Sequence, residues 1–504
     1  MTSDRGLDGI VVGGGPNGLA AAIELARAGR SVRVYEAADT VGGGTRSAEL
    51  TLPGFIHDPC SAAHPLGIAS PFFRSLDLAR HGLSWVQPDA PMAHALAPGR
   101  SVILERDLEA MRAELGRDGD AWVRLFGPLV REWERLLPAL LAPVVRPPRH
   151  PLLMARFGLP ALLPATGLAR LAFREPAARA LFSGLAGHSM VPLGRPLTSS
   201  FGLVLGLLAH AVGWPLVRGG SGRIADALEA EARSLGVEIV TGHRVRDLAE
   251  LPAARAVLLD LTPRQVLAVA GDRLTGSYRR ALERYRYGPG VCKVDWALAG
   301  PIPWLDPRTT RAATVHLGGP AGEVATAEAA VGRGRLPNRP FVLLVQPTIA
   351  DPTRAPAGRH IAWAYCHVPN GSPADRTAAI EDQVERFAPG FRGPRPRPQR
   401  PQRTRHGGLR RELRRRRYQR GNRGRAPAAV PARRPLEPVH DTRRRAVPLL
   451  LVHPAGRGRA WHERDARSAR GAPAGLNGRE EASIGGGQRG DLHRHSTSAT
   501  RSRA

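Results

Sequence analysis

A glycine run near the start of the chain has the composition and spacing to bind the phosphates of a dinucleotide. In a Gly-x-Gly-x-x-Gly run, the first glycine permits a tight turn and the second lets the backbone approach a pyrophosphate. The third lets a helix pack closely against a strand, and the N–H groups of that helix point at the phosphates. The run GGGPNG comprises Gly13, Gly14, Gly15, Pro16, Asn17 and Gly18. We therefore predict a dinucleotide site here; the alternative is a glycine-rich turn without a ligand.

An acidic residue follows at the distance expected for a ribose contact. Glu36 ends the stretch SVRVYE, 21 residues after Gly15. A carboxylate at the end of the second strand of such a unit can accept hydrogen bonds from a ribose diol. We predict that Glu36 binds the ribose of the dinucleotide.

A second glycine turn, VGGGTR, lies just beyond this acid. Its backbone could pass close to the second phosphate and the ribityl chain of a flavin dinucleotide, with its arginine near the pyrophosphate. A turn of this kind is typical of flavoproteins and unusual in simple NAD dehydrogenases. The alternative is a surface turn with a solvated arginine. The residues expected to bind here are Gly42, Gly43, Thr45 and Arg46.

The elements predicted around these residues form the framework that such a site requires. Residues 8–12 are apolar enough for a short buried strand, residues 16–29 carry apolar side chains at helical spacing, and residues 31–36 alternate as a second strand. Together they predict a strand–helix–strand unit of about 30 residues, the building block of parallel α/β sheets.

Beyond these motifs, much of the chain resembles a known family. The stretch GGGPNGLAAAIELARAGRSVRVYEAADTVGGGTRS is similar to the N-terminus of the phytoene desaturase-like FAD oxidoreductases, which are related to the amine oxidases. Further matching stretches follow in the family's order, among them GFIHDPCSAAHPL, WPLVRGGSGRIADALEAEARSLGVEIVTGHRV and GPGVCKVDWALAGPIPW. The bacterial branch that it resembles is similar to pyridine nucleotide-disulfide oxidoreductase domain-containing protein 2. The resemblance covers residues 5–392.

The resemblance implies a tightly bound FAD, whose flavin takes hydride from a small apolar substrate while the protein supplies orientation and electrostatics. It assigns the backbone of Val245 to the adenine. It also assigns to FAD, by position, Gly13, Gly15, Gly18, Glu36, Gly43 and Arg46. We therefore expect an FAD-dependent oxidoreductase, and the sequence names neither its substrate, its electron acceptor nor its oligomeric state.

The resemblance and the patterns predict an α/β fold, in which a Rossmann-like FAD-binding domain of the amine oxidase and phytoene desaturase type is interrupted by a helical and sheet substrate domain. We expect the FAD-binding domain in residues 1–75 and 214–287, and a mainly helical region facing substrate or membrane in residues 76–213. A substrate-domain sheet is expected in residues 288–392. Residues 393–504 are rich in Arg, Pro and Gly, lack periodicity and are expected to form a disordered tail.

Catalytic side chains are harder to assign. Lys293, the single lysine of the chain, lies mid-strand in an apolar context. In related flavin oxidases a lysine can hold a water near flavin N5, and a desolvated lysine shifts its pKa readily; the alternative is a lysine that faces solvent. His64 and His316 could lie near the flavin, with a core histidine as the alternative for each. Asp58 is expected to be a turn or cap residue, and no metal site is expected.

The net charge of +29 is concentrated in the tail, where residues 393–504 carry 29 basic and 8 acidic side chains. The family's third flavin-binding segment, which contains Pro-Pro-Gly and a His-Gly-Met turn, is absent in frame. With third codon positions chosen freely, a one-base shift turns residues 413–420, 446–454 and 453–464 into stretches that resemble the family's C-terminal segments, in the family's order. We therefore interpret the tail as a frameshifted translation, which would impair the flavin site.

Two alternative functions stay open at this point. A flavin amine oxidase would normally have an aromatic cage beside the flavin, and only 5% of the residues are aromatic. A nonspecific binder of nucleic acid or of anionic surfaces could use the arginine-rich tail. That tail lacks interleaved aromatic residues for stacking on bases, so we expect no specific nucleic-acid partner.

Cysteine usage and hydropathy indicate the compartment. Cys60, Cys292 and Cys366 are too sparse for a disulfide framework or a zinc site, and no secretory signal is evident, so we expect a cytoplasmic protein. Residues 196–217 carry no charge and are long enough to span a bilayer. Their glycines and prolines favour a buried helix pair or an apolar cavity wall, with peripheral contact to a membrane as the alternative.

Overall fold

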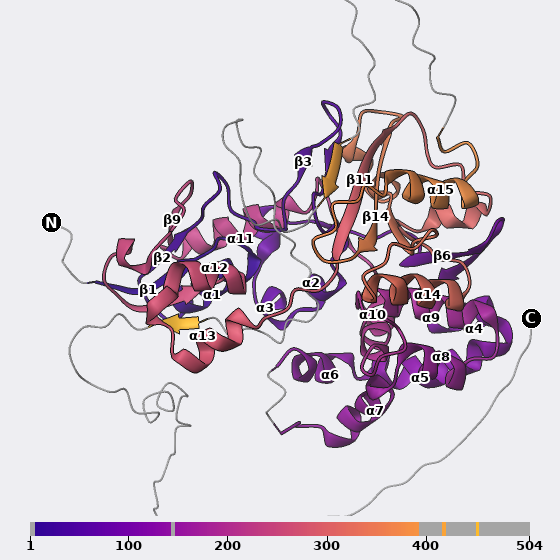
Figure 1. The fold of residues 1–504 in the computed structure, drawn as a ribbon, viewed down its shortest axis with the longest axis horizontal. Coiled ribbons are helices and arrows are strands. Elements are labelled where there is room, and N and C mark those ends of the chain that lie inside the picture. The colour runs from indigo at the N-terminus through magenta and orange to yellow at the C-terminus, as the bar shows by residue number, and fades with distance from the viewer. Residues whose placement is uncertain (1–5, 143–146, 393–415, 420–449, 453–504) are drawn as a thin grey trace, which may run out of the picture. The chain divides into compact units, whose positions relative to one another are not determined.

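A computed structural model of the 504-residue chain describes residues 6–142, 147–392, 416–419 and 450–452. Two sheets organise these residues, and Figure 1 shows helices packed against both. The order and register of the strands explain how distant sequence motifs come together.

The first sheet has five strands in the order β16-β10-β1-β2-β9. Four of them run parallel, and β16 pairs antiparallel with β10. The strands are β1 (Leu7–Val12), β2 (Val32–Tyr35), β9 (Glu238–Val240), β10 (Ala254–Leu259) and β16 (Leu450–Val452). The parallel core is Rossmann-like, and its carboxyl edge is where ligands bind in open α/β sheets.

Helices cover both faces of this sheet. One face packs apolar residues against α1 (Pro16–Arg27) and α11 (Gly222–Ser234), with Ile23 and Leu228 fully buried. The other face packs against α12 (Pro263–Ala270) and α13 (Gly276–Glu283). Both faces of β1 are therefore buried, which explains its continuous apolar run.

The second sheet has seven strands in the order β15-β11-β14-β13-β12-β6-β7. All neighbouring pairs are antiparallel except β12 and β6. The strands are β6 (Met92–Ala97), β7 (Arg100–Leu104), β11 (Gly290–Leu298), β12 (Thr314–Leu317), β13 (Val342–Val345), β14 (His360–Val368) and β15 (Arg416–Gln419). The β6–β7 hairpin lies inside the region 76–213, where the sequence pattern predicted helices. Two residues, Pro98 and Gly99 (φ +72°), separate its strands.

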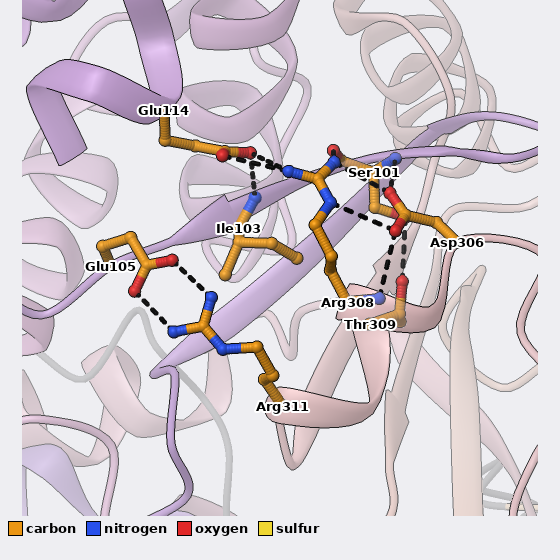
Figure 2. A network of polar contacts seen from close by, with 8 residues as sticks. All are labelled: Ser101, Ile103, Glu105, Glu114, Asp306, Arg308, Thr309 and Arg311. Carbon is orange, nitrogen blue, oxygen red and sulfur yellow. Dashed lines mark hydrogen bonds and ion pairs between the residues drawn. The ribbon is translucent and has the colours of Figure 1, made fainter. Parts of the chain in front are cut away.

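A polar network ties this hairpin to the short 3-10 helix before β12, Pro307–Arg311 (Figure 2). Arg308 donates to both carboxylate oxygens of Glu114, at 3.2 and 3.1 Å. Arg311 and Glu105 form a two-pronged pair at 2.6 and 3.0 Å. Because both guanidinium groups are paired with carboxylates, we interpret this cluster as a structural clamp.

Helices form a block on one face of the second sheet. They are α4 (Leu108–Leu115), α5 (Gly119–Arg131), α6 (Trp133–Leu140), α7 (Pro151–Leu162), α8 (Ala165–Ala172), α9 (Pro176–Gly187), α10 (Ser199–Ala211) and α14 (Ala321–Gly332). The opposite face of the sheet packs against α15 (Thr377–Phe387). Further short elements are β3 (Ala48–Glu49), β4 (Ile56–His57), α2 (Pro65–Ala69), α3 (Pro71–Arg74), β5 (Trp85–Val86) and β8 (Leu216–Val217), and seven 3-10 helices also lie among the described residues.

The uncharged stretch 196–217 contains α10, which is a buried helix. A Cβ added at Gly206 would lie 2.4 Å from the ring of Phe126, and one at Gly202 would lie 2.9 Å from Phe182. Glycine at these two positions lets the rings reach the helix backbone. Within the described residues, no single helix is long and apolar enough to cross a membrane, although α7 and α8 pass that test together across a bend of 107°.

Two short strands are described within residues 393–504, where no secondary structure was predicted. β15 extends the edge at β11 and β16 extends the edge at β10. Edge pairing uses backbone groups, so it places few demands on side-chain type. Both strands fall within stretches that the frameshift interpretation identified, 413–420 and 446–454. The rest of the predicted disordered tail, including all of 453–464, lies outside the described residues.

Candidate functional site

The first glycine turn connects β1 to α1 and is built so that only glycine fits at its ends. Gly13 has φ +113°, a left-handed conformation that favours glycine. A Cβ added at Gly18 would lie 1.9 Å from the carbonyl oxygen of Gly13. The contact explains the third glycine of the run as a close approach of helix to strand. Gly15 is the residue before α1 and has no side chain of its own to cap the helix.

The remaining positions of this turn lie where a phosphate-binding helix start requires them. Pro16 is the first residue of α1, a position where its missing N–H is tolerated. Asn17 is exposed in the first turn, whereas Gly14 is buried under Glu36. The sequence expectation of a strand–turn–helix at this run is therefore confirmed.

Glu36 lies beside the first glycine turn. Its Oε2 accepts a hydrogen bond of 2.9 Å from the backbone N–H of Gly14, and its Oε1 accepts one of 2.8 Å from Ala38. A carboxylate has about four acceptor positions, so acceptor capacity is left for a ribose diol. The N–H of His243 donates to the carbonyl oxygen of Glu36 at 2.9 Å. This bond brings the segment that contains Val245, which is buried beside Tyr35, to the same edge of the sheet.

The second glycine turn lies directly against the first. Gly42 (φ +118°) donates from its N–H to the carbonyl oxygen of Gly14 at 2.7 Å. A Cβ added at Gly43 would lie 3.1 Å from the Cα of Gly15. Thr45 Oγ1 donates to the carbonyl oxygen of Gly42 at 2.8 Å. Two backbone turns that meet in this way form a continuous cradle, which side chains at these glycines would fill.

Arg46 closes one side of that cradle. Its guanidinium donates to the carbonyl oxygens of Thr40 at 2.5 Å and Val41 at 3.3 Å, and it lies 3.8 Å from Glu36 Oε1. The alternative of a solvated arginine is therefore wrong, because the side chain is only 20% exposed.

Asp260 belongs to the same site, and the sequence analysis missed it. It follows β10, and its Oδ2 accepts a hydrogen bond of 3.0 Å from the N–H of Gly18. A carboxylate is stabilised at a helix N-terminus by the same N–H groups and dipole that bind phosphate. The sequence does place this acid directly after a buried strand. In a parallel sheet that position lies at the ligand-binding edge, and this could have marked Asp260 as a candidate.

Lys293 lies far from solvent in the second sheet. It is 4% exposed and forms an ion pair with Asp295, two residues further along the same face of β11. Its ammonium also lies 4.7 Å from the ring centroid of Trp363 on β14. The alternative of a lysine facing solvent is therefore wrong. The ammonium is covered by Asp295 and by the ring of Trp363.

A histidine connects this ion pair to the segment after the second glycine turn. His57 Nδ1 lies 3.5 Å from Asp295 Oδ1, and both side chains are fully buried. Burial lowers the pKa of His57 to about 3, and the charges of Lys293 and Arg354 add to this effect. Burial also raises the pKa of Asp295, and the charge of Lys293 opposes that rise. His57 is therefore neutral at pH 7 and was not anticipated from the sequence.

Asp58 was expected to be a turn or cap residue, and it is instead the centre of a buried polar network. It accepts from Arg354 at 2.8 Å, from Ser47 Oγ at 2.7 Å and from the N–H of Ser221 at 2.8 Å. Burial of a carboxylate requires such partners. The network joins the segment after the second glycine turn to the start of α11 and to residue 354.

The two candidate histidines lie in different places. His64 is half-buried beside this network, with Nε2 2.8 Å from Ser221 Oγ. His316 is fully buried on β12, with Nε2 3.0 Å from His188 Nε2. Burial holds the pKa of His316 well below its ordinary value. Their roles remain predictions, as does that of Lys293, and no metal-binding group of three or more ligands exists among the described residues.

Comparisons with known proteins agree with this geometry. Residues 11–76 match the family model described as an NAD(P)-binding Rossmann-like domain. The chain is 25% identical over 474 residues to pyridine nucleotide-disulfide oxidoreductase domain-containing protein 2 of Rattus norvegicus, covering 76% of this chain and 79% of that protein. It is 26% identical over 390 residues to phytoene dehydrogenase of Streptomyces griseus, covering 72% and 73%. The chain is a dinucleotide-binding oxidoreductase.

The fold of this oxidoreductase is also found in solved structures. A variant of putrescine oxidase redesigned in its cofactor binding aligns with a TM-score of 0.50 at 18% identity, covering 77% of this chain and 83% of that one. The predicted α/β fold with a Rossmann-like domain is thus confirmed. So is the predicted resemblance to phytoene desaturases, from a relative that spans most of the chain.

Proposed function

We propose that the chain is an FAD-dependent oxidoreductase that abstracts hydride from an apolar substrate, as a phytoene desaturase-like enzyme does. The observation that carries this proposal is the contact between the two glycine turns, from Gly42 N–H to the carbonyl oxygen of Gly14. A single turn suffices for a nicotinamide dinucleotide. A second turn against the first extends the backbone cradle in the way that flavoproteins use, and relatives named as a dehydrogenase of phytoene and a desaturase of hydroxyneurosporene support the same chemistry.

The residues of the cradle fit the adenosine diphosphate half of FAD. The pyrophosphate would lie against the backbone at Gly15, in the turn that Gly13 and Gly18 make possible. Glu36 would bind the ribose, and the backbone near Val245 would bind the adenine. The bound cofactor would supply the hydride acceptor. The chain's own contribution is to bind and orient it, and the segment expected to hold the isoalloxazine falls in residues outside the described part.

Lys293 is the side chain that we propose to hold a proton or a water at the reaction site. Its ammonium is held in place by the ion pair with Asp295 and by the face of Trp363, which fixes the position from which it could donate a hydrogen bond to a water. His64 and His316 are kept as weaker candidates for the same role.

An apolar substrate fits better than an amine. Trp363 and Tyr365 stack at a centroid distance of 6.0 Å, so an aromatic pair does exist beside Lys293. The face of Trp363, however, already receives the ammonium of Lys293, and a substrate ammonium there would meet a like charge. The neighbouring residues Ala62 and Val345 are apolar. These contacts favour an apolar substrate, so the flavin amine oxidase ranks second among the candidate functions.

We further propose that the protein works in the reducing cytoplasm. Its three cysteines form no disulfide in the described residues, although Cys292 and Cys366 face each other across β11 and β14. The arginine-rich tail is proposed to have no specific nucleic-acid partner. A nonspecific electrostatic binder would lose affinity steeply as salt rises, which a titration with DNA at two salt concentrations would reveal.

Calorimetric titration of the full chain with FAD and with NAD⁺ tests the proposal, together with the visible absorption of the purified protein. We expect FAD to bind at least tenfold more tightly than NAD⁺. The same titration on a chain whose residues after 393 come from the shifted reading frame should give a still lower Kd for FAD. Tighter binding of NAD⁺ than of FAD by both chains would overturn the proposal.

A further inference from the structure

Helix α7 exposes leucines that a folded protein would ordinarily bury. Of nine exposed large apolar side chains among the described residues, six lie between residues 141 and 197. Three of them, Leu152, Leu159 and Leu162, lie on α7 and are 87%, 68% and 58% exposed. Their spacing of seven and three residues places them on one face of the helix. The opposite face of α7 is held by the buried residues Phe157 and Ala161.

A fourth leucine extends this face. The backbone N–H of Leu197 donates to the carbonyl oxygen of Leu162 at 3.1 Å, so the two residues are neighbours. Leu197 is 56% exposed and has φ +70°, a conformation that is unfavourable for a leucine. Backbone strain of this kind often occurs at residues with a role beyond packing, which makes Leu197 a candidate for such a role. We call Leu152, Leu159, Leu162 and Leu197 the leucine face.

An arginine-lined hollow adjoins the leucine face. It has a volume of about 390 Å³ and lies between α4, α5 and α7. Its charged lining consists of Arg112, Arg124, Arg131, Arg156 and Asp120. Asp120 is paired with Arg112 at 3.0 Å. The other three arginines have no acidic partner within the described part of the chain, and Arg156 lies on α7 between Leu152 and Leu159.

The positive charge of this hollow indicates which kind of partner can bind the leucine face. A second copy of the chain docked face to face would bring arginines against arginines. The chain's own residues 393–504 carry 29 basic and 8 acidic side chains, so they repel the same hollow. A bilayer that contains anionic phospholipids satisfies both features, because phosphates pair with arginine and leucines enter the acyl boundary.

We propose that α7 docks the protein on the surface of an anionic phospholipid bilayer, with the leucine face in the acyl boundary and the arginine-lined hollow on lipid phosphates. The helix lies in the interface and does not cross it, since 12 residues span only about 18 Å against a hydrocarbon core of about 30 Å. Figure 1 shows α7 at the outer edge of the helical block, away from the second sheet. The proposal does not depend on the bound cofactor or on the reaction.

Vesicle co-sedimentation with the full chain tests it, with phosphatidylcholine vesicles compared with vesicles containing 30% phosphatidylglycerol, a proportion chosen as roughly that of an anionic membrane. The L152Q/L159Q variant should lose at least tenfold in partition to the anionic vesicles at 0.5 M salt, where electrostatic binding of the tail is screened. The R124Q/R156Q variant should lose about fivefold per arginine at low salt. Leu336→Gln and R333Q/R335Q, in an exposed loop elsewhere, are the matched controls and should leave partition unchanged.

A second readout reports directly on insertion. Leu159→Trp should be quenched by brominated acyl chains in anionic vesicles, whereas Leu336→Trp should not. Equal partition of L152Q/L159Q and the unaltered chain at 0.5 M salt would overturn the proposal. So would a change from dimer to monomer in L152Q/L159Q without loss of vesicle binding, since that result would make the leucine face a contact between copies of the chain.

Discussion

Lys293 and Asp295 form an ion pair whose charged groups are both removed from solvent, with side chains 6% and 0% exposed. They lie on the same face of β11, because residues two apart in a strand point the same way. The face of Trp363 covers the ammonium on one side, at 4.7 Å from the ring centroid. A buried pair of this kind depends on each partner, since the loss of one leaves an uncompensated charge.

A double-mutant cycle on this pair should show strong coupling. Lys293→Met and Asp295→Asn should each lower the free energy of unfolding by about 3–5 kcal/mol, because each leaves one partner buried and unpaired. The double variant should be more stable than the sum of the two losses predicts, by about 2 kcal/mol or more. Urea unfolding followed by circular dichroism measures all four chains without any cofactor. Additive losses would show that the two groups do not interact.

Substitution of Glu36 should weaken dinucleotide binding more than folding. Glu36→Gln keeps the size of the side chain, but its amide would point N–H groups at the N–H of Gly14 or Ala38. Hydrogen bonds from the ribose hydroxyls to a charged carboxylate contribute about 1.5–3 kcal/mol to binding. Their loss or weakening in Glu36→Gln should raise the Kd for FAD about tenfold or more. Calorimetry measures the Kd. Glu238→Gln, at an exposed acid paired with Arg33 on the same sheet, should leave it unchanged.

Gly18 should be intolerant of even one added carbon. A Cβ there would lie 1.9 Å from the carbonyl oxygen of Gly13, a backbone atom that cannot move away cheaply. Gly18→Ala should therefore destabilise the chain by about 3 kcal/mol or more. Gly322→Ala is the matched control, because Gly322 lies in the first turn of α14 with no atom within 4 Å of the added Cβ. That variant should gain about 0.5 kcal/mol, and similar melting temperatures for both would contradict the prediction.

The dinucleotide site could be predicted because its main residues are close in sequence. One strand–helix–strand unit places Gly13, Gly18 and Glu36 at the same sheet edge, and the spacing alone encodes that geometry. Asp260 could not be found in this way, since 242 residues separate it from Gly18, whose N–H donates a hydrogen bond to it. Its position depends on β10 pairing with β1, which no local pattern specifies.

The partners of Lys293 show the same limit. Its spacing on β11 identifies Asp295 as a neighbour on one face, but the burial of that face depends on residues distant in sequence that pack against it. His57 reaches Asp295 from the segment after the second glycine turn, and Trp363 from β14. Local periodicity therefore predicts the strand. The burial of the lysine arises from contacts with residues distant in sequence, which no local pattern specifies.

Breaking the contact between Asp58 and Arg354 should be costly, because both side chains are at most 1% exposed. Asp58→Asn keeps the shape but leaves the guanidinium without its carboxylate, and should destabilise the chain by about 3–5 kcal/mol. The control is Glu229→Gln, which breaks the exposed helix pair of Glu229 with Arg233 and should change stability by about 0.5 kcal/mol or less. Equal effects in chemical unfolding would show that burial does not decide the contribution.

Stability should fall as the pH drops from about 6.5 to 4, because several histidines are buried in the neutral form. Burial lowers the pKa of His57 to about 3 and that of His94 and His210 to about 4. The unfolded chain binds protons at these rings below their ordinary pKa of 6.5, whereas the folded chain does not. Protonation therefore favours unfolding, and each such ring contributes a slope of about 1.4 kcal/mol per pH unit in this window.

His210 gives the sharpest test of that slope. Its Nε2 accepts a hydrogen bond of 2.9 Å from the indole N–H of Trp122, and its Nδ1 lies 2.9 Å from the carbonyl oxygen of Arg106. Both ring nitrogens are thus used by one neutral tautomer, and a second proton would break the bond from Trp122. His210→Gln should reduce the pH dependence of the unfolding free energy by about 1.4 kcal/mol per unit between pH 4 and 6. The exposed His150 provides the control variant, His150→Gln. An unchanged slope in the His210 variant would show that this ring accepts a proton in the folded chain.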